Sequence, residues 1–300
     1  MSRGQMIILE DLDSIISKKP YICIEAIYDS SYSIRMHTPI LLTNKDIPAV
    51  RAYIAAEKEM NLFIEGDIEQ YGLETETVSL WAFGEDWDCL LLRYYSNFII
   101  SSNKDQFDVQ AVADFLQNQE IQCISAKETI LQQLAPYYPT IPFQGTYLCR
   151  LEKVHFKKLK TGTEDILKLD SSHAQDIVDL YKLIDEFSKP YIEHEEEKLR
   201  QTRENYEKGC EGYGIFKDGM LVCTAYTTAT TRSGAMIIGV ATHPAYRQRG
   251  YASMVMNHLC EQGFERGLSF LCLFYDNPTA GALYHRLGFE TIGRWAMMKF

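Results

Sequence analysis

Apolar residues in the second half of the chain alternate between runs typical of buried strands and stretches with helical spacing. Residues 235–241 (A-M-I-I-G-V-A) are apolar throughout and predict a buried strand, and apolar residues then recur at helical spacing from Ala252 to Cys260. The whole half is expected to contain helices at 172–186 and 192–208, strands at 212–216, 221–230 and 235–242, a helix, a strand at 268–275, another helix, and closing strands to residue 300.

The first half repeats this order. It predicts a helix at 46–63, strands at 78–83, 89–95 and 98–101, a helix at 107–118, a strand at 121–124 and a helix at 127–134. Three strands, helix, strand, helix is also the succession of the second half. The prolines of 136–142 favour an extended connection, so we expect two similar domains, residues 1–140 and 141–300.

Composition and charge narrow the functional classes. The 300 residues are 46% hydrophobic and 12% aromatic, which is ample for two globular cores. A net charge of −11 argues against nucleic acid as a partner and slightly favours a cationic substrate. The first residues, M-S-R-G-Q-M-I-I-L-E-D, do not resemble a signal peptide, and no apolar run is long enough for a membrane span. We therefore expect a cytoplasmic protein.

Three features have a structural interpretation that is favoured over a functional one. The eight cysteines form no C-x-x-C pair and are interpreted as reduced core residues, neither a zinc site nor a disulfide framework. The acidic run 193–197 (E-H-E-E-E) could touch a metal, but it is better explained as a solvated helix start, and no metal site is predicted. The run 81–87 (W-A-F-G-E-D-W) could be an aromatic binding patch, although a strand and a glycine-containing hairpin explain it more simply.

A motif between the strand at 235–242 and the following helix carries the main chemical signal. Residues 247–252 read R-Q-R-G-Y-A. Gly250 allows close approach of the main chain to a ligand, and Ala252 keeps the first helical turn small. Unpaired amide groups at a helix N-terminus, with the positive end of its dipole, form a cradle for a phosphate anion.

A second motif follows the next strand. Asn277 and Pro278 suit a helix start, Gly288 suits a helix end, and the spacing is N-P-x-A-x-x-x-Y-x-x-x-G-F. The succession strand, R-x-x-G-x-A, helix, strand and this second motif resembles the GNAT superfamily of acyl-CoA-dependent N-acyltransferases. The resemblance implies the acyl-CoA N-acyltransferase fold, an α/β (α+β) architecture in which helices flank a mixed central sheet, here in tandem.

The resemblance also implies site residues. The strand before the loop would pair with the pantetheine arm, the loop amides would hold the pyrophosphate of acetyl-CoA beside two arginines, and Asn277 would hydrogen-bond the cofactor. Tyr284 matches the tyrosine that protonates the departing thiolate, although a packing tyrosine is the alternative. The implied cofactor-binding residues are Val240, Ala241, Thr242, Arg247, Gln248, Arg249, Gly250, Tyr251, Ala252, Ser253 and Asn277.

The general base is left unassigned. A primary amine has a pKa near ~10, so most of it is protonated at pH 7 and a proton acceptor is expected. Several members of the superfamily carry a glutamate on one of the two strands beside the site, and no carboxylate stands in either strand here. The candidates are His243, Asp276 and the 193–195 cluster, each with a stronger structural explanation, or a chain of water molecules.

The first half is interpreted as a degenerate GNAT-like copy. Its corresponding loop, residues 101–105 (S-S-N-K-D), has no glycine and includes an aspartate that would repel phosphate. This half either forms a wall of the acceptor pocket or only covers an edge of the catalytic domain. The function expected is acetyl transfer from acetyl-CoA to a primary amine of a small molecule or peptide. The alternatives are a non-catalytic acyl-CoA sensor and a tandem-GNAT aminoacyltransferase that uses charged tRNA.

Overall fold

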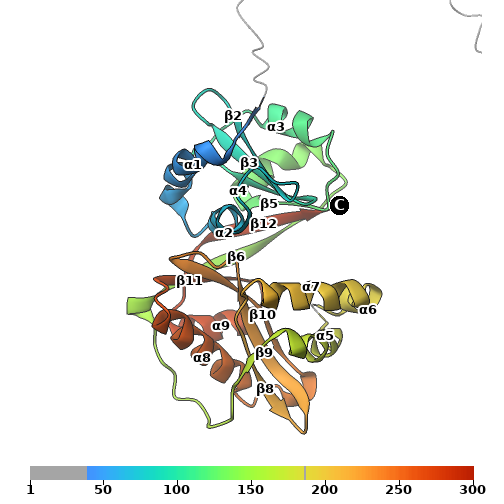
Figure 1. The fold of residues 1–300 in the computed structure, drawn as a ribbon, viewed down its shortest axis with the longest axis vertical. Coiled ribbons are helices and arrows are strands. Elements are labelled where there is room, and N and C mark those ends of the chain that lie inside the picture. Colours follow the sequence, from blue (N-terminus) through green and yellow to red (C-terminus); the bar gives the residue numbers. More distant parts are fainter. Residues whose placement is uncertain (1–38, 186) are drawn as a thin grey trace, which may run out of the picture. The chain divides into compact units, whose positions relative to one another are not determined.

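The computed structural model describes residues 39–185 and 187–300 (Figure 1). The expected absence of a signal peptide concerns residues outside this part, and so does Cys23. Within the described residues, no helix combines the length and the apolar character needed to cross a membrane. The seven described cysteines are all free and five of them are buried, as expected for core thiols.

The first half alternates short helices with strands in nearly the predicted order. Its elements are β1 (Ile40–Leu41), α1 (Ile47–Ile54), α2 (Leu62–Tyr71), β2 (Val78–Phe83), β3 (Cys89–Tyr94), β4 (Asn97–Ser101), α3 (Val109–Leu116), β5 (Cys123–Lys127), α4 (Glu128–Leu134) and β6 (Phe143–Glu152). The succession of three strands, helix, strand and helix is confirmed in β2 to α4.

The second half repeats that succession from β8 to α9. Its elements are β7 (Leu167–Leu169), α5 (Ala174–Lys182), α6 (Ser188–Glu193), α7 (Glu195–Glu207), β8 (Gly212–Lys217), β9 (Met220–Thr228), β10 (Gly234–Thr242), α8 (Tyr251–Glu265), β11 (Phe270–Tyr275), α9 (Pro278–Leu287) and β12 (Glu290–Lys299). Each half therefore ends in a ten-residue strand, β6 or β12.

These two long strands join the halves by a reciprocal exchange. The described strands form one sheet in the order β1-β2-β3-β4-β5-β12-β6-β11-β10-β9-β8-β7. Strand β6 follows the first half in sequence but pairs with β11, whereas β12 follows the second half but pairs with β5. The two also pair with each other, antiparallel, from Phe143 opposite Met298 to Arg150 opposite Glu290. The predicted boundary at 140/141 falls just before the first exchanged strand.

Helices cover both faces of this sheet (Figure 1). Alternate residues of β12 show the two sides: Trp295 packs in the core under α1 and α2, and Ala296 packs in the core under α3 and α4. In the second half, α8 and α9 cover one face, and α5 packs against β9 and β10 on the other. This confirms a mixed sheet flanked by helices, with β4–β5 and β10–β11 as the parallel pairs among the described strands.

The prediction of one continuous helix at 46–63 was wrong. In the structure α1 ends at Ile54, a 3-10 turn spans Ala55–Glu57, and α2 begins only at Leu62 and continues to Tyr71. The side-chain amide of Asn61 donates to the carbonyl oxygens of Ile54 and Glu57, at 3.4 and 3.0 Å. These bonds satisfy the carbonyl groups at the end of α1 and of the 3-10 turn. The first helix can therefore end there, and a second helix begins at Leu62.

Four further elements were not predicted: the short strands β1 and β7, strand β6 and helix α6. Strand β6 is recognisable only by its pairing with β11 and β12, which are more than a hundred residues away in the sequence. The helix predicted at 192–208 is preceded by α6 and begins at Glu195, because His194 leaves helical geometry at φ −132° and ψ 45°. The run 81–87 does form the predicted hairpin, with Gly84 at φ +82° in its turn.

Candidate active site

A gap between two parallel strands marks the centre of the candidate site. Strands β10 and β11 pair only as far as Ile237 and Leu273. On its other edge, β10 shifts register against β9 between Ile238 and Ala241. Past Ile237, no described strand pairs with β10 on its β11 side, so its backbone groups there are open to a ligand. Val240, Ala241 and Thr242, the residues predicted to face pantetheine, lie in this stretch.

A glycine and a tyrosine fix the shape of the strand at this gap. Gly239 has φ +63°, and a Cβ on it would overlap the hydroxyl of Tyr181 and the ring of Tyr226. The Tyr181 hydroxyl donates to the Gly239 carbonyl oxygen. Neither residue was predicted from the sequence. The available signal was the glycine inside an otherwise apolar strand, which is typical of a bulge.

The loop after β10 leads into α8 with its amide groups unused. Gly250 takes the left-handed conformation at φ +82°, and no side chain caps the helix. In the part of the chain that the structure describes, no loop carbonyl or side chain accepts a hydrogen bond from the amides of residues 248–253. Nothing lies within 4 Å of the position of a Cβ on Gly250. This geometry fits the pyrophosphate of an acyl-CoA.

Three arginines surround this loop. Arg247 donates from Nε to the carbonyl oxygen of Thr242 at 3.3 Å, and the Arg249 guanidinium lies 4.9 Å from the ring centre of Tyr246. Arg286, which was not predicted from the sequence, reaches from α9 to the Ser253 hydroxyl at 3.4 Å. The three cations would offset phosphate charge at the start of α8.

In the first half, the start of the corresponding helix, α3, already has a side-chain cap. The Asp108 carboxylate accepts from the amide of Ala111 at 3.0 Å and caps α3, so both the amide and the local positive potential are already used. The Ser102 hydroxyl, at the preceding turn, donates to the Asp88 carbonyl oxygen. Asp108 thus caps α3 with a negative charge, whereas Gly250 leaves the start of α8 uncapped. This difference agrees with the interpretation of the first half as a degenerate copy that lacks the phosphate cradle.

The second motif folds as its residues suggest. The Asn277 side chain accepts from the amide of Thr279 at 2.9 Å, and α9 ends at Gly288 with φ +101°. Asn277 uses its carbonyl oxygen as the helix cap, and its NH₂ group remains as a donor for a cofactor.

Tyr284 lies on the inner face of α9, 5% exposed. Its ring centre is 5.9 Å from that of Tyr275 and 6.0 Å from that of Phe289. Burial, with a smaller contribution from Cys149, raises the pKa of Tyr284 to about 12. Among the described residues its hydroxyl has no hydrogen-bond partner. It therefore stays protonated at neutral pH and is free to donate.

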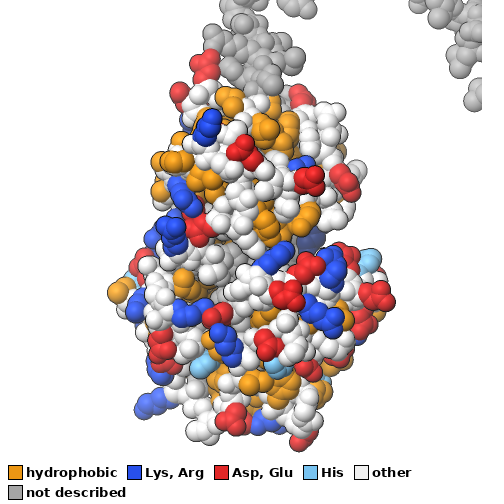
Figure 2. All heavy atoms as spheres, in the orientation of Figure 1, with side chains coloured by type: hydrophobic (Ala, Val, Ile, Leu, Met, Phe, Trp, Pro, Cys, Tyr) orange, Lys and Arg blue, Asp and Glu red, His pale blue; other side chains and the backbone are white. Residues whose placement is uncertain are grey.

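Three of the candidate bases, His243, Asp276 and Glu195, have partners elsewhere in the structure. His243 accepts from the Ala245 amide through Nδ1 at 3.1 Å, as a turn residue. Asp276 accepts from Gln144 at 3.0 Å. Within the acidic run, Glu195 pairs with Lys182, and Glu197 accepts from Gln201 at 2.7 Å. Figure 2 shows acidic and basic side chains interspersed over α6 and α7, as on a solvated helix surface.

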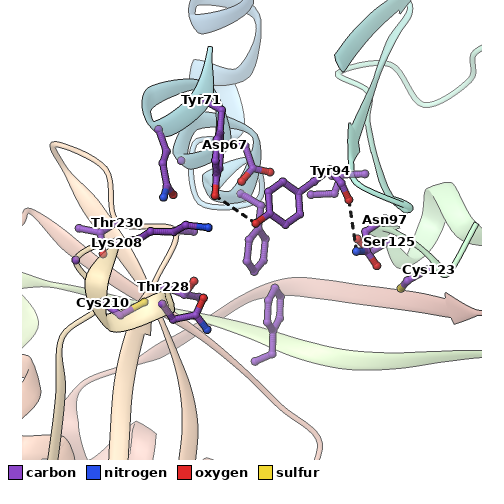
Figure 3. A pocket seen from close by; sticks show the side chains of 18 of the residues that line it. Asp67, Tyr71, Tyr94, Asn97, Cys123, Ser125, Lys208, Cys210, Thr228 and Thr230 are labelled. Carbon is purple, nitrogen blue, oxygen red and sulfur yellow. Dashed lines mark hydrogen bonds between the residues drawn. The ribbon is translucent and has the colours of Figure 1, made fainter. Parts of the chain in front are cut away.

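A cavity of about 420 Å³ lies on the face of the sheet opposite Tyr284, where α2 approaches the C-terminal end of α7 (Figure 3). Phe274 lines it, and this is the first β11 residue past the last pair with β10, so the cavity reaches the gap between the strands. Trp295 contributes from β12 and Tyr94 from β3. The wall is thus built by both halves.

The family comparison agrees with this geometry. Residues 178–289 match the model of the acetyltransferase (GNAT) family. This segment is a GNAT domain. It contains the β10 gap, the α8 cradle and Tyr284, and ends at Phe289, two residues after α9. The domain supports an acyltransferase activity.

Solved structures extend the likeness to both halves. A Drosophila protein superposes with a TM-score of 0.68 at 11% identity, covering 88% of this chain and 99% of its own. A GCN5-related N-acetyltransferase-like protein from Streptococcus suis gives 0.58 at 15% identity, covering 86% and 100%. A tandem GNAT protein from the clavulanic acid biosynthesis pathway gives 0.55 at 13% identity, covering 88% and 98%. No curated protein matches the sequence. At these identities the likeness shows the tandem GNAT fold.

Proposed function

We propose that the protein is an N-acetyltransferase that moves the acetyl group of acetyl-CoA to a primary amine of a small molecule or peptide. The observation that carries this proposal is the uncapped start of α8 at Gly250, directly beside the unpaired edge of β10. The pantetheine arm of an acyl-CoA would lie along that edge, and its pyrophosphate would bind the amide groups at the start of α8. The residues proposed to bind it are those implied by the sequence, together with Gly239 and Arg286.

The gap between β10 and β11 gives the two reactants access from opposite faces of the sheet. Tyr284 lies on the face covered by α8 and α9, and the cavity lies on the face covered by α2 and α7. An amine in the cavity would give its ammonium proton to water and reach the thioester through the gap. As the free amine it would attack the carbonyl carbon directly in a ternary complex, so that the C–N bond forms, the C–S bond breaks and CoA leaves as the thiolate. Direct attack requires the amine and thioester to be held together, which the two-sided arrangement provides.

Tyr284 would donate a hydrogen bond to the sulfur as the thiolate leaves. With its pKa raised to about 12, the tyrosine is a weaker acid than a thiol of pKa near ~8.5. Full proton transfer to the sulfur is therefore uphill, and the main contribution is stabilisation of developing charge in the transition state.

The test is release of CoA thiol from acetyl-CoA with a panel of amines, beside calorimetric binding of CoA. We expect one CoA site per chain and amine-dependent thiol release. Binding without turnover on any amine would favour the acyl-CoA sensor, and the absence of CoA binding would contradict the proposal altogether. Binding of charged tRNA would indicate the aminoacyltransferase.

A further inference from the structure

Two charged side chains line the cavity between the halves: Asp67 on α2 and Lys208 at the end of α7 (Figure 3). The other lining residues are neutral. Among them, Cys210 has its pKa raised to about 11 by burial, so its thiol stays protonated at neutral pH. The cavity therefore offers a ligand one negative and one positive group.

Asp67 has no partner within the described part of the chain. No hydrogen bond or ion pair reaches its carboxyl group, and burial alone raises its pKa from 3.8 to about 7. Asp67 is partly buried, and a partly desolvated carboxylate without a counter-ion is costly, so a bound cation would remove that cost. The group is thus arranged to receive a positive charge that the protein does not supply.

Aromatic rings surround the same space. Phe63 stacks on Phe274 with ring centres 6.2 Å apart, and Phe274 lies 5.8 Å from Trp295. The hydroxyls of Tyr71 and Tyr94 share a hydrogen bond of 3.3 Å. Ring faces beside a carboxylate are the usual surroundings of a bound ammonium group, since both attract a cation.

Lys208 presents the opposite charge from the other wall. Its Nζ lies 5.8 Å from the ring centre of Tyr71 and 4.0 Å from the Glu204 carboxylate, the outer limit of an ion pair. Burial lowers its pKa, but interactions with the Tyr71 hydroxyl and neighbouring acidic groups outweigh this, and the net pKa is raised. It remains a cation and can bind an acidic group.

We propose that this cavity binds a zwitterionic amine: a small molecule whose primary ammonium is held by Asp67 among the aromatic rings and whose acidic group is held by Lys208. A volume of about 420 Å³ is suited to a small molecule. Asn97, Ser125 and Asn205 supply further hydrogen-bonding groups along the wall. The inference rests on the proposed function in taking this amine as the acetyl acceptor. The binding itself requires no acyl donor.

The experiment is calorimetry on the full chain at pH 8, where Asp67 is ionised. The probes are ω-amino acids with one to five methylene groups between amine and carboxylate, each compared with the amine and the carboxylic acid of matched length. We expect at least one ω-amino acid to bind about tenfold more tightly than both of its matched probes, since it alone engages both charges. The absence of such an advantage at every length would overturn the proposal.

Two near-isosteric variants separate the contributions that the ammonium and the carboxylate of the ligand make to its affinity. Asp67→Asn should weaken both the ω-amino acid and the amine by about tenfold. Lys208→Gln should remove only the advantage of the ω-amino acid and leave amine binding unchanged. Lys168→Gln, on the exposed face of β7, is the matched control and should change nothing. Zwitterion affinity unaffected by Asp67→Asn and Lys208→Gln would contradict the assignment.

Acetyl transfer distinguishes failure of this inference from failure of the proposed function. If other amines are acetylated at the same rate by the parent protein and by both variants, the acceptor site lies elsewhere and this inference is wrong while the function stands. If ω-amino acids bind in the Asp67- and Lys208-dependent manner but CoA does not bind, the cavity assignment stands and the acetyltransferase proposal fails.

Discussion

The hydroxyl of Tyr181 donates a hydrogen bond of 2.9 Å to the carbonyl oxygen of Gly239, and this bond holds the bulge of β10 from the side of α5. The carbonyl belongs to the stretch that has left its partner on β11. The bond thus ties a helix of the GNAT domain to the backbone segment proposed to face the pantetheine arm.

Loss of this bond is expected to weaken acyl-CoA binding. Tyr181→Phe leaves the Gly239 carbonyl oxygen without its donor, at a cost of about 0.5–1.5 kcal/mol, and frees the bulge to shift. We expect a lower melting temperature and an acetyl-CoA KM raised severalfold. Tyr191→Phe is the control, because its ring packs 5.0 Å from that of Tyr181 and its hydroxyl has no partner among the described residues. Equal effects of the two variants would show that only packing matters.

The cradle can be tested with a pair of glycines in nearly the same conformation. Gly250→Asp places a negative charge at the start of α8 and should weaken CoA binding by a factor on the order of a hundred, the equivalent of about two charge-assisted hydrogen bonds. Gly219→Asp, in the β8–β9 turn, is the control. Gly219 has φ +78°, against +82° for Gly250, and a Cβ at either position would have no atom within 4 Å. CoA affinity that falls equally in both variants, or in neither, would contradict the cradle.

The strand exchange predicts that the GNAT domain does not fold well by itself. In a fragment of residues 143–300, β12 loses its pairing with β5, and the side chains of Trp295, Ala296 and Met298 lose the cores that bury them. We expect this fragment to aggregate or to melt without cooperativity, and to become soluble when co-expressed with residues 1–142. A soluble fragment with a cooperative melt close to that of the full chain would show that the exchanged strand is dispensable.

The same exchange explains what could be predicted from the sequence. The left-handed Gly250 and the start of α8 were predictable because both are local, and their conformations follow from a few adjacent residues. Strand β6 was not, because Tyr147 and Leu148 become strand residues only through partners in β11 and β12. Asp67 was missed for a related reason: the cavity that it lines is completed by residues of α7 and β9, which are far away in the sequence, and by itself Asp67 is one of many acidic residues on a helix.

Asp67 also predicts a pH dependence of stability. Its pKa is near 7 in the folded chain and near 3.8 when unfolded, so the folded state holds a proton that the unfolded state releases. The stabilisation is present in full below pH ~4 and is lost as the pH rises through ~7, with a slope of at most about 1.4 kcal/mol per pH unit between these values. Denaturant melts of Asp67→Asn from pH 5 to 8 should lack this contribution. Identical pH profiles for the parent protein and the variant would refute the assignment.

Tyr284→Phe is expected to keep CoA affinity and lose turnover. The hydroxyl of this buried tyrosine has no partner in the described structure, so removing it costs little stability and affects the ground state hardly at all. In the transition state it would meet a sulfur that is gaining negative charge. Because a thiolate is already a fair leaving group and the raised pKa of the tyrosine limits full proton transfer, we expect kcat and kcat/KM to fall together by roughly tenfold to a few hundredfold.

The control for Tyr284 is Tyr213→Phe, which removes the hydroxyl of another buried tyrosine of the same core. It should leave kcat near the parent value and lower stability slightly, because its hydroxyl donates to the Glu211 carboxylate at 3.4 Å. Both variants are compared by steady-state kinetics with acetyl-CoA saturating, after thermal melts establish that they are folded. A packing role for Tyr284 predicts slightly lower stability and normal turnover. A Tyr284→Phe kcat within about twofold of the parent, well below the range of general-acid effects, would remove the tyrosine from the mechanism.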